Sequence, residues 1–423
     1  MRQLIDNLDE LGAAVGSCLI LYSGGLDSSW FLLWAREHGL RAVAVHVHLG
    51  GGEPSAEVAE RAARLGADYR TFDLTGFFAE HYVAPAVRAN ALYQGAFPVC
   101  SSLSRPLMAE VALKVARDES IGCVVHTTTY VQNSAARFNN SLRALSPELL
   151  IANPFIHQPV RREEQRRQLA AAGVEVRAGI YSVDENIWGR VIECGELDDP
   201  ANRVPAHIWQ WTAEQVRAPS TPTFVTLGFE RGVPVALDGR PLPLDQLIIA
   251  LNELGGVYGV GRYNGLEDTP FGVKNHEVRE APAATSILAA HAALERAVLT
   301  QREIRVKSAA DAEWTELITN GFWHSPLREA TGELISSLSR FVTGEVVLEY
   351  RPGGVFVSAV SAPHALHFWN VSRLTTQPFD NFSYPQYFEI ASLPEWLRGR
   401  GGWRPAETLT DEALGRTPRR LTG

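Results

Sequence analysis

Residues Leu19–Ser29 read LILYSGGLDSS, and their types and spacing suit the binding of phosphate groups. The apolar run Leu19–Leu21 predicts a buried strand, and the stretch Trp30–His38 predicts an amphipathic helix. The two glycines between them allow a tight turn whose backbone N–H groups converge at a helix N-terminus. Three hydroxyl groups accompany this turn, on Ser23, Ser28 and Ser29. The segment therefore predicts a nest for the pyrophosphate of a nucleotide.

This motif is neither the GxxxxGK[ST] loop of common ATPases nor the GxGxxG dinucleotide turn. Its pattern SGGxD[ST]S resembles the loop of the ATP pyrophosphatases, which cut ATP between the α and β phosphates. The alternative is an ordinary strand–helix turn capped by Asp27 or Ser28. A cap explains neither both glycines nor all three hydroxyls, so we favour the nucleotide loop.

Composition excludes several classes of protein. The 423-residue chain has a formal net charge of −9, which argues against a nucleic-acid partner. No apolar run reaches the length of a membrane span, and the N-terminal residues lack the pattern of an export signal. The four cysteines form no CxxC pair, which favours free thiols in a reducing compartment. We therefore expect a cytoplasmic protein without membrane contact.

Strand and helix patterns alternate through the first third of the chain, which predicts an α/β domain over 1–165 with a parallel sheet and helices on both faces. The predicted strands are 19–22, 42–49, 68–74 and 122–129, and the predicted helices are 30–38, 55–66 and 105–120. Ligands on such sheets bind at the carboxyl ends of the strands. The glycine loop, the HLGGGE segment and the HTTTYVQN segment all follow strands at that edge.

The pattern changes after a charged helix at 161–173. We expect a second, mixed α+β domain over 166–365, with a hairpin at 223–239 that turns at ERG and helices at 242–256 and 286–299. The last stretch, 366–423, is rich in Pro, Trp and Arg and is expected to be a C-terminal arm.

Several segments beyond the loop give the chain a resemblance to the argininosuccinate synthase family. They appear in the family's order: SLSRP, YSVDENIWGRVIECGELDDP, LNELGGVYGVGRYNGLED, GVKNHEVREAPA and TNGFWHSP. The resemblance implies an adenine nucleotide alpha hydrolase-like N-terminal domain, followed by a synthetase and multimerisation domain. It also implies ATP and Mg²⁺ as cofactors, and a homotetramer.

The reaction that the resemblance implies is an AMP-forming C–N ligation. The ureido oxygen of citrulline attacks the α-phosphorus of ATP and pyrophosphate leaves. The amine of aspartate then attacks the activated carbon and AMP leaves. The partners are thus a small ureido compound and an amino acid.

The resemblance also assigns site residues. The nucleotide would be held by Tyr22, Ser23, Gly24, Gly25, Leu26, Asp27, Ser28, Ser29 and Val47. Catalytic roles fall to Asp27, Ser23 and Arg137, with Asp27 toward magnesium and Arg137 as a carboxylate clamp. The substrates would contact Phe97, Ser101, Ser102, Arg105, Thr129, Asn133, Ser134, Arg137, Ser182, Val191, Glu267 and Arg279.

The chain departs from the family at its substrate contacts. Larger side chains, Tyr130 and Gln132, stand in the family's glycine-rich segment, and Ser134 replaces an aspartic acid. Around citrulline, Phe97 and Arg279 replace tyrosines and Val191 replaces a serine. We hypothesise altered substrates: Arg279 would meet an extra acid group, or else turn outward. The alternatives are a non-catalytic nucleotide-binding protein and an ATP pyrophosphatase acting on another acceptor.

Overall fold

The computed structural model describes residues 4–51, 56–129, 132–176, 179–269 and 271–366, with residues 392 and 396. The chain divides into two compact units, Met1–Ala365 and Leu366–Gly423. The expected arm at 366–423 thus lies almost wholly outside the described residues. Among the helices of the described ranges, none combines the length and apolarity of a membrane span.

A six-stranded parallel sheet forms the N-terminal part of the first unit, in the order β1-β8-β7-β2-β3-β4. The strands are β1 Leu4–Ile5, β2 Ser17–Leu21, β3 Arg41–His48, β4 Asp68–Asp73, β7 Cys123–Val125 and β8 Leu150–Ala152. The parallel sheet and its four predicted strands are confirmed. The sequence analysis missed β1 and β8, which are too short to show a periodic pattern.

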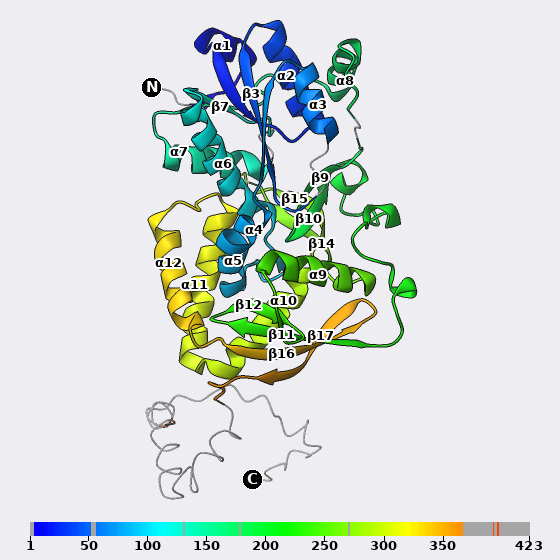
Figure 1. The fold of residues 1–423 in the computed structure, drawn as a ribbon, viewed down its shortest axis with the longest axis vertical. Helices are drawn as coiled ribbons and strands as arrows, with labels where there is room; N and C mark the ends of the chain where they lie inside the picture. The colour runs from blue at the N-terminus through cyan, green and yellow to red at the C-terminus, as the bar shows by residue number, and fades with distance from the viewer. Residues whose placement is uncertain are drawn as a thin grey trace, which may run out of the picture. The chain divides into compact units, whose positions relative to one another are not determined.

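Helices cover both faces of this sheet (Figure 1). They are α1 Leu8–Ala14, α2 Leu26–Glu37, α3 Ala56–Arg64, α4 Thr75–Phe78, α5 Ala84–Arg88, α6 Ser101–Asp118, α7 Asn133–Leu145 and α8 Arg162–Ala171, with a π-helical turn at Ala79–Val83. Alternate residues of β2 enter different cores: Ile20 packs in the cluster of Phe31 from α2, and Leu19 in that of Leu103 from α6. This burial on both faces explains why β2 is apolar throughout.

The rest of the first unit carries two antiparallel sheets. One has the order β14-β15-β10-β9, with β9 Ser182–Asn186, β10 Gly189–Glu193, β14 Arg262–Asp268 and β15 Lys274–Glu280. The other has the order β13-β12-β11-β16-β17, with β11 Thr223–Glu230, β12 Val233–Leu237, β13 Arg240–Pro241, β16 Gly344–Arg351 and β17 Gly354–Ser361. The hairpin predicted at 223–239 is confirmed as β11 and β12.

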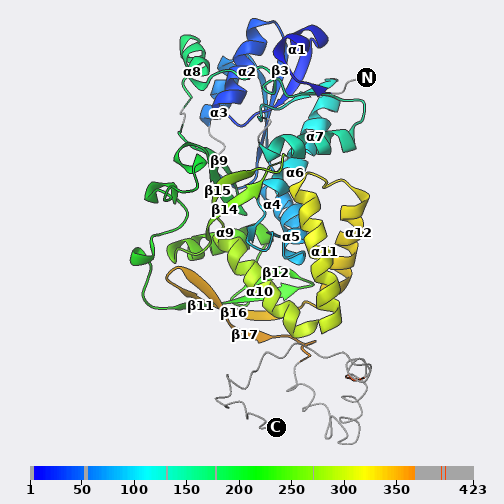
Figure 2. The same cartoon turned by 180° about the vertical axis from the view of Figure 1, so that it is seen from behind.

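Four helices accompany these sheets, α9 Leu244–Val257, α10 Pro282–Val298, α11 Gln301–Thr319 and α12 Pro326–Ser339. Helices α9 and α10 lie beside the five-stranded sheet, and α11 and α12 run side by side (Figures 1 and 2). A short hairpin, β5 Leu92–Tyr93 and β6 Phe97–Pro98, completes the unit together with 3₁₀ turns at Gly195–Asp198, Ala206–Ile208 and Gln215–Arg217. The predicted α+β mixture is present.

The segment after β3 packs directly against the turn between β9 and β10. Gly50 has φ +79°, and a Cβ on it would lie 1.8 Å from Cγ2 of Ile187. The Ile187 backbone N–H donates to the Leu49 carbonyl at 2.9 Å. This close approach joins the parallel sheet to the four-stranded sheet at the carboxyl end of β3.

Helix α8 packs on α2 (Figures 1 and 2). The Trp30 indole N–H donates to Gln168 Oε1 at 2.6 Å, and the Gln165 amide donates to Asp27 Oδ1 at 2.9 Å. Residue 165, the expected end of the first domain, therefore lies inside a helix that contacts the glycine loop.

Candidate functional site

The turn between β2 and α2 leaves backbone donors directed at the cavity. Helix α2 begins at Leu26, four residues earlier than predicted, so Asp27 and Ser28 lie in its first turn. The N-cap residue is Gly25, and no side chain caps the helix. The alternative of a turn capped by Asp27 or Ser28 is therefore wrong. Uncapped N–H groups and the helix dipole give this end a partial positive charge.

Gly24 shapes the turn. Its φ is +74°, and a Cβ on it would lie 2.9 Å from Cγ1 of Val58 on α3. Its carbonyl accepts a hydrogen bond of 2.6 Å from Nη1 of Arg61, also on α3. Only glycine meets both the left-handed conformation and the close approach.

The loop hydroxyls hold one another in place. Ser23 Oγ lies 3.2 Å from Ser28 Oγ, and Ser23 Oγ also accepts from the Gly25 N–H at 3.2 Å. Tyr22 Oη lies 3.2 Å from Ser29 Oγ. Ser29 is fully buried, so its hydroxyl supports the loop instead of facing the cavity.

A cavity of about 700 Å³ opens from this loop. It lies at the carboxyl ends of β7, β2 and β3, where the strand order reverses, as such sheets predict. Predicted site residues that line it are Tyr22, Ser23, Gly25, Leu26, Asp27, Ser28, Val47, Ser101, Arg105, Asn133, Ser134, Arg137, Ser182 and Val191. Predicted residues absent from its lining are Gly24, Ser29, Phe97, Ser102, Thr129, Glu267 and Arg279.

The cavity also contains polar residues that the sequence analysis missed, namely His46, His48, His126, Thr128, Gln132, Asp184, Glu185, Glu193, Asn275 and Glu277. His126 is buried, and burial lowers its pKa to about 4, so its imidazole is neutral at pH 7. Its Nε2 donates to Asn139 Oδ1 at 2.9 Å, and its Nδ1 accepts from the Thr128 hydroxyl at 2.8 Å.

Arg105 forms a two-point ion pair with Asp184. Its Nη1 and Nη2 donate to the two carboxylate oxygens at 3.2 and 2.6 Å. Its Nε donates to Ser134 Oγ at 3.2 Å. Ser134, predicted to face an amine substrate, is thus already held by a protein cation.

The segment before α7 is fixed by amide contacts. Gln132 Oε1 accepts from the Thr129 N–H at 3.0 Å, and Gln132 Nε2 donates to Glu193 Oε1 at 3.3 Å. Asn133 donates to the Asp268 carbonyl at 2.9 Å. Tyr130, one of the larger side chains noted in the sequence, lies outside the described residues. The side chain of Gln132 therefore helps to shape the cavity wall.

Arg137 is buried, and each of its side-chain nitrogens has a protein partner. Nε donates to the Thr319 carbonyl at 2.7 Å, Nη1 to Ser101 Oγ at 3.2 Å and Nη2 to Glu267 Oε1 at 2.9 Å. The guanidinium is therefore held rigidly at the cavity wall. Its open fork, expected to clamp a carboxylate at two points, is partly occupied by Glu267.

Arg279 points into the protein, so the expectation that it turns outward is wrong. It is buried, and its guanidinium carbon lies 4.1 Å from the centre of the Phe97 ring. Its Nη2 pairs with Glu277 and lies 3.4 Å from Glu267 Oε2. The extra positive charge is thus matched by protein carboxylates, which does not favour the hypothesis of an extra substrate acid.

The strand register explains this arrangement. Residues 275, 277 and 279 alternate along β15 and share one face of the sheet. Val191 of β10 pairs with Arg279, and Glu267 of β14 pairs with Asn275. Neighbouring strands thereby bring side chains distant in sequence to one wall of the cavity.

The two carboxyl groups of this wall have opposite pKa shifts. Burial opposes the charge of Glu267, but the attraction of Arg137 and Arg279 outweighs it and lowers the pKa to about 2. Burial raises the pKa of Glu277 to about 8; Arg279 opposes the rise, and the charges of Glu267 and Glu193 add to it. Glu267 is therefore charged at pH 7 and Glu277 is mostly protonated.

We expect Glu277→Gln to flatten part of the pH dependence of stability. A carboxyl whose folded pKa of about 8 exceeds its unfolded value stabilises the fold at low pH. That stability is lost as pH rises from about 4.5 to about 8. Melting temperatures measured across this range should fall more steeply for the wild type than for Glu277→Gln. Parallel curves for the two proteins would contradict the assignment.

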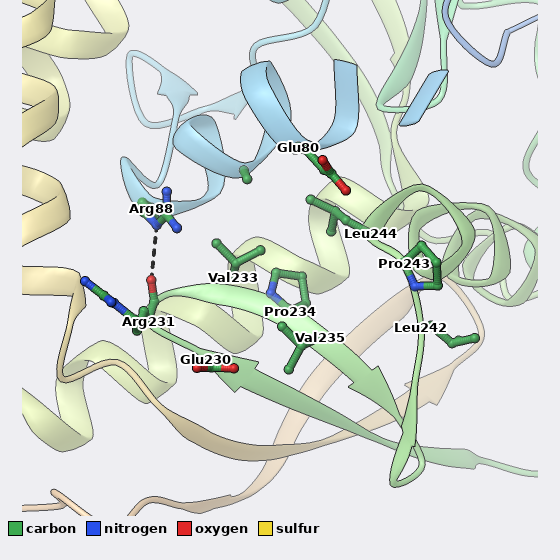
Figure 3. A pocket seen from close by; sticks show the side chains of 11 residues that line it. Glu80, Arg88, Glu230, Arg231, Val233, Pro234, Val235, Leu242, Pro243 and Leu244 are labelled. Atoms are coloured by element: carbon green, nitrogen blue, oxygen red, sulfur yellow. Dashed lines mark hydrogen bonds between the residues drawn. The ribbon is translucent and has the colours of Figure 1, made fainter. Parts of the chain in front are cut away.

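A second cavity, of about 400 Å³, lies between the α4–α5 segment and β12 (Figure 3). Pro234 and Leu244 are among its apolar residues, and Arg88 Nε donates to the Arg231 carbonyl at its edge at 3.1 Å. It contains none of the predicted site residues. The large cavity is therefore the candidate active site.

Comparison with known proteins assigns the family. Residues 17–175 match a family model described as "Arginosuccinate synthase N-terminal HUP domain", and residues 181–395 match "Arginosuccinate synthase C-terminal domain". The argininosuccinate synthase of Pyrococcus furiosus is 39% identical over 366 residues, which covers 86% of this chain and 89% of that protein. That of Rubrobacter xylanophilus is 38% identical over 381 residues, covering 89% and 93%. The chain belongs to the argininosuccinate synthase family.

Proposed function

We propose that the protein is an AMP-forming ligase that joins a ureido carbon to an amine. The ureido oxygen attacks the α-phosphorus of ATP, so an O–P bond forms as the bond to pyrophosphate breaks. The amine nitrogen then attacks the activated carbon, loses a proton, and displaces AMP together with the original ureido oxygen. The observation that carries this proposal is the uncapped turn at Gly24–Ser28, which opens into the same cavity as Arg105 and Arg137.

The roles of the loop follow from its geometry. The first-turn N–H groups of α2 and the hydroxyls of Ser23 and Ser28 would hold the phosphates, and the backbone near Val47 would meet the adenine. These donors stabilise negative charge that grows on the leaving pyrophosphate.

A magnesium ion fits this site as a companion of the phosphates. The described residues contain no group of three His, Cys, Asp or Glu side chains that could hold a metal. Asp27 lines the cavity beside the loop and would contact the ion directly or through water, with phosphate oxygens supplying most ligands. When bound, the ion would neutralise phosphate charge.

The substrates are expected to differ from citrulline and aspartate. Arg105 occupies Ser134, Glu267 occupies part of the Arg137 fork, and Arg279 fills the space beside Phe97. These contacts change the recognition of substrate ends and leave the phosphate loop intact. We also propose, from the family resemblance, a cytoplasmic homotetramer.

Pyrophosphate release tests this function. The protein is incubated with ATP, Mg²⁺, a panel of ureido compounds that includes citrulline, and a panel of amines that includes aspartate. We expect pyrophosphate and AMP in equal amounts, dependent on a ureido compound. Nucleotide binding without pyrophosphate release for any pair would instead support a non-catalytic protein. Efficient turnover of citrulline with aspartate would contradict the altered substrates.

A further inference from the structure

One end of the cavity is closed by two arginines and two glutamates, which we call the charge cluster: Arg137, Glu267, Glu277 and Arg279. Their exposed fractions are 2%, 4%, 7% and 4%. Arg137 and Glu277 line the cavity, and Glu267 and Arg279 lie behind them. A substrate end that reaches this wall therefore meets a preformed set of charges.

The carboxylates of the charge cluster are already matched by protein cations and donors. Glu267 Oε1 accepts from Arg137 at 2.9 Å, and Glu267 Oε2 lies 3.4 Å from Arg279 Nη2. Glu277 Oε2 pairs with Arg279, and Glu277 Oε1 accepts from Asn275 at 3.3 Å. A substrate ammonium here would have to displace a buried arginine, and it would add a third positive charge to the wall.

The neighbouring acid, Glu193, is also occupied. Its two oxygens accept from Gln132 at 3.3 Å and from Asn275 at 2.8 Å. An ammonium that bound Glu193 would compete with both amides. Each carboxylate oxygen of Glu193, Glu267 and Glu277 therefore already has an amide or a guanidinium beside it.

Donor groups, in contrast, remain at this wall. Nη1 and Nη2 of Arg137 each carry a second hydrogen beyond those given to Ser101 and Glu267. The Ser101 hydroxyl accepts from Arg137, which leaves its own hydrogen to donate. Two arginines face Glu267, which is charged, and Glu277, whose pKa is raised to about 8. At pH 7 the charge cluster thus has an excess of positive charge and suits an anion.

Given the proposed function, we propose that the carbonyl substrate is a ureido carboxylic acid without an ammonium group, and that Arg279 occupies the cation position beside Glu267. The substrate carboxylate would accept from Arg137 and Ser101. Arg279 is then a specificity-determining residue: it excludes an α-amino acid end by holding the carboxylate that an ammonium would need.

Three matched ureido compounds test this inference by calorimetry, with an ATP analogue that cannot be cut between its α and β phosphates. They are 5-ureidopentanoate, which has only a carboxylate, N-carbamoylputrescine, which has only an ammonium, and citrulline, which has both. We expect 5-ureidopentanoate to bind roughly tenfold or more tightly than citrulline, because a buried unpaired charge is excluded. N-carbamoylputrescine should bind most weakly. Tighter binding of either ammonium compound, or no binding of all three, would overturn the inference.

Two variants locate the effect. Arg279→Met frees Glu267 Oε2 and should shift the binding ratio toward citrulline by roughly tenfold. Arg279→Lys keeps the cation and should keep the wild-type order. If Arg279→Met does not fold, the order measured for the wild type decides alone. The predicted binding order without pyrophosphate release would contradict only the proposed ligase, whereas pyrophosphate release with citrulline preferred would contradict only this inference.

Discussion

Gly24→Ala should reduce ATP-dependent pyrophosphate release by roughly 100-fold or more, because phosphate donors that shift in a preorganised site lose most of their effect. The new Cβ would lie 2.9 Å from Val58, and the residue would keep a φ of +74° only under strain. Relief of that strain moves the turn that Arg61 holds through the Gly24 carbonyl. The measurement is steady-state pyrophosphate release at saturating ATP.

Gly39→Ala is the matched control. Gly39 has φ +68°, a Cβ on it would meet no atom within 4 Å, and it follows α2 at the end remote from the loop. Both variants should lose about 1–2 kcal/mol of unfolding free energy from the left-handed conformation. Only Gly24→Ala should lose activity. Equal activities in the two variants would show that the turn does not hold the phosphates.

Arg137→Lys should also lower the catalytic efficiency of pyrophosphate release by roughly 100-fold, since a misplaced binding group weakens substrate positioning. Lysine keeps one charge but cannot reproduce the three bonds to Thr319, Ser101 and Glu267. The lost hydrogen bonds should reduce the free energy of unfolding by about 1–3 kcal/mol. Kinetics and chemical denaturation together separate these effects.

Arg190→Lys separates catalysis from stability. Arg190 is also buried, at 4% exposed, and donates to Glu280 at 2.9 Å and to the Ile208 carbonyl at 2.8 Å. It does not line the cavity. A similar loss of stability with unchanged pyrophosphate release is expected for Arg190→Lys. Equal losses of activity in both variants would mean that Arg137 acts through the fold alone.

The parts of the site that local sequence determines were predictable. An apolar strand followed by glycines and hydroxyls indicated the turn at Gly24, and parallel topology indicated which loops share its edge. The start of α2 was predicted too late, because Asp27 and Ser28 are poor helix formers in isolation. Tertiary packing of the helix start overrides that preference.

The parts that depend on distant pairing were not predictable. Asp184 lies 79 residues from its partner Arg105, and no local pattern connects them. Glu277 lies two residues before Arg279 on β15, so alternation along a strand could have revealed it. The position of Glu267 beside both arginines requires the register of β14 and β15, which the sequence pattern alone does not specify.

Oxygen tracing tests the central claim, that the loop exposes the α-phosphorus of ATP to a ureido oxygen. The protein is supplied with ATP, aspartate and 5-ureidopentanoate labelled with ¹⁸O at the ureido oxygen, and then, in parallel, with labelled citrulline. Mass spectrometry of the released AMP should find one labelled oxygen on its phosphate for whichever compound is consumed. Unlabelled AMP formed during turnover would contradict the mechanism.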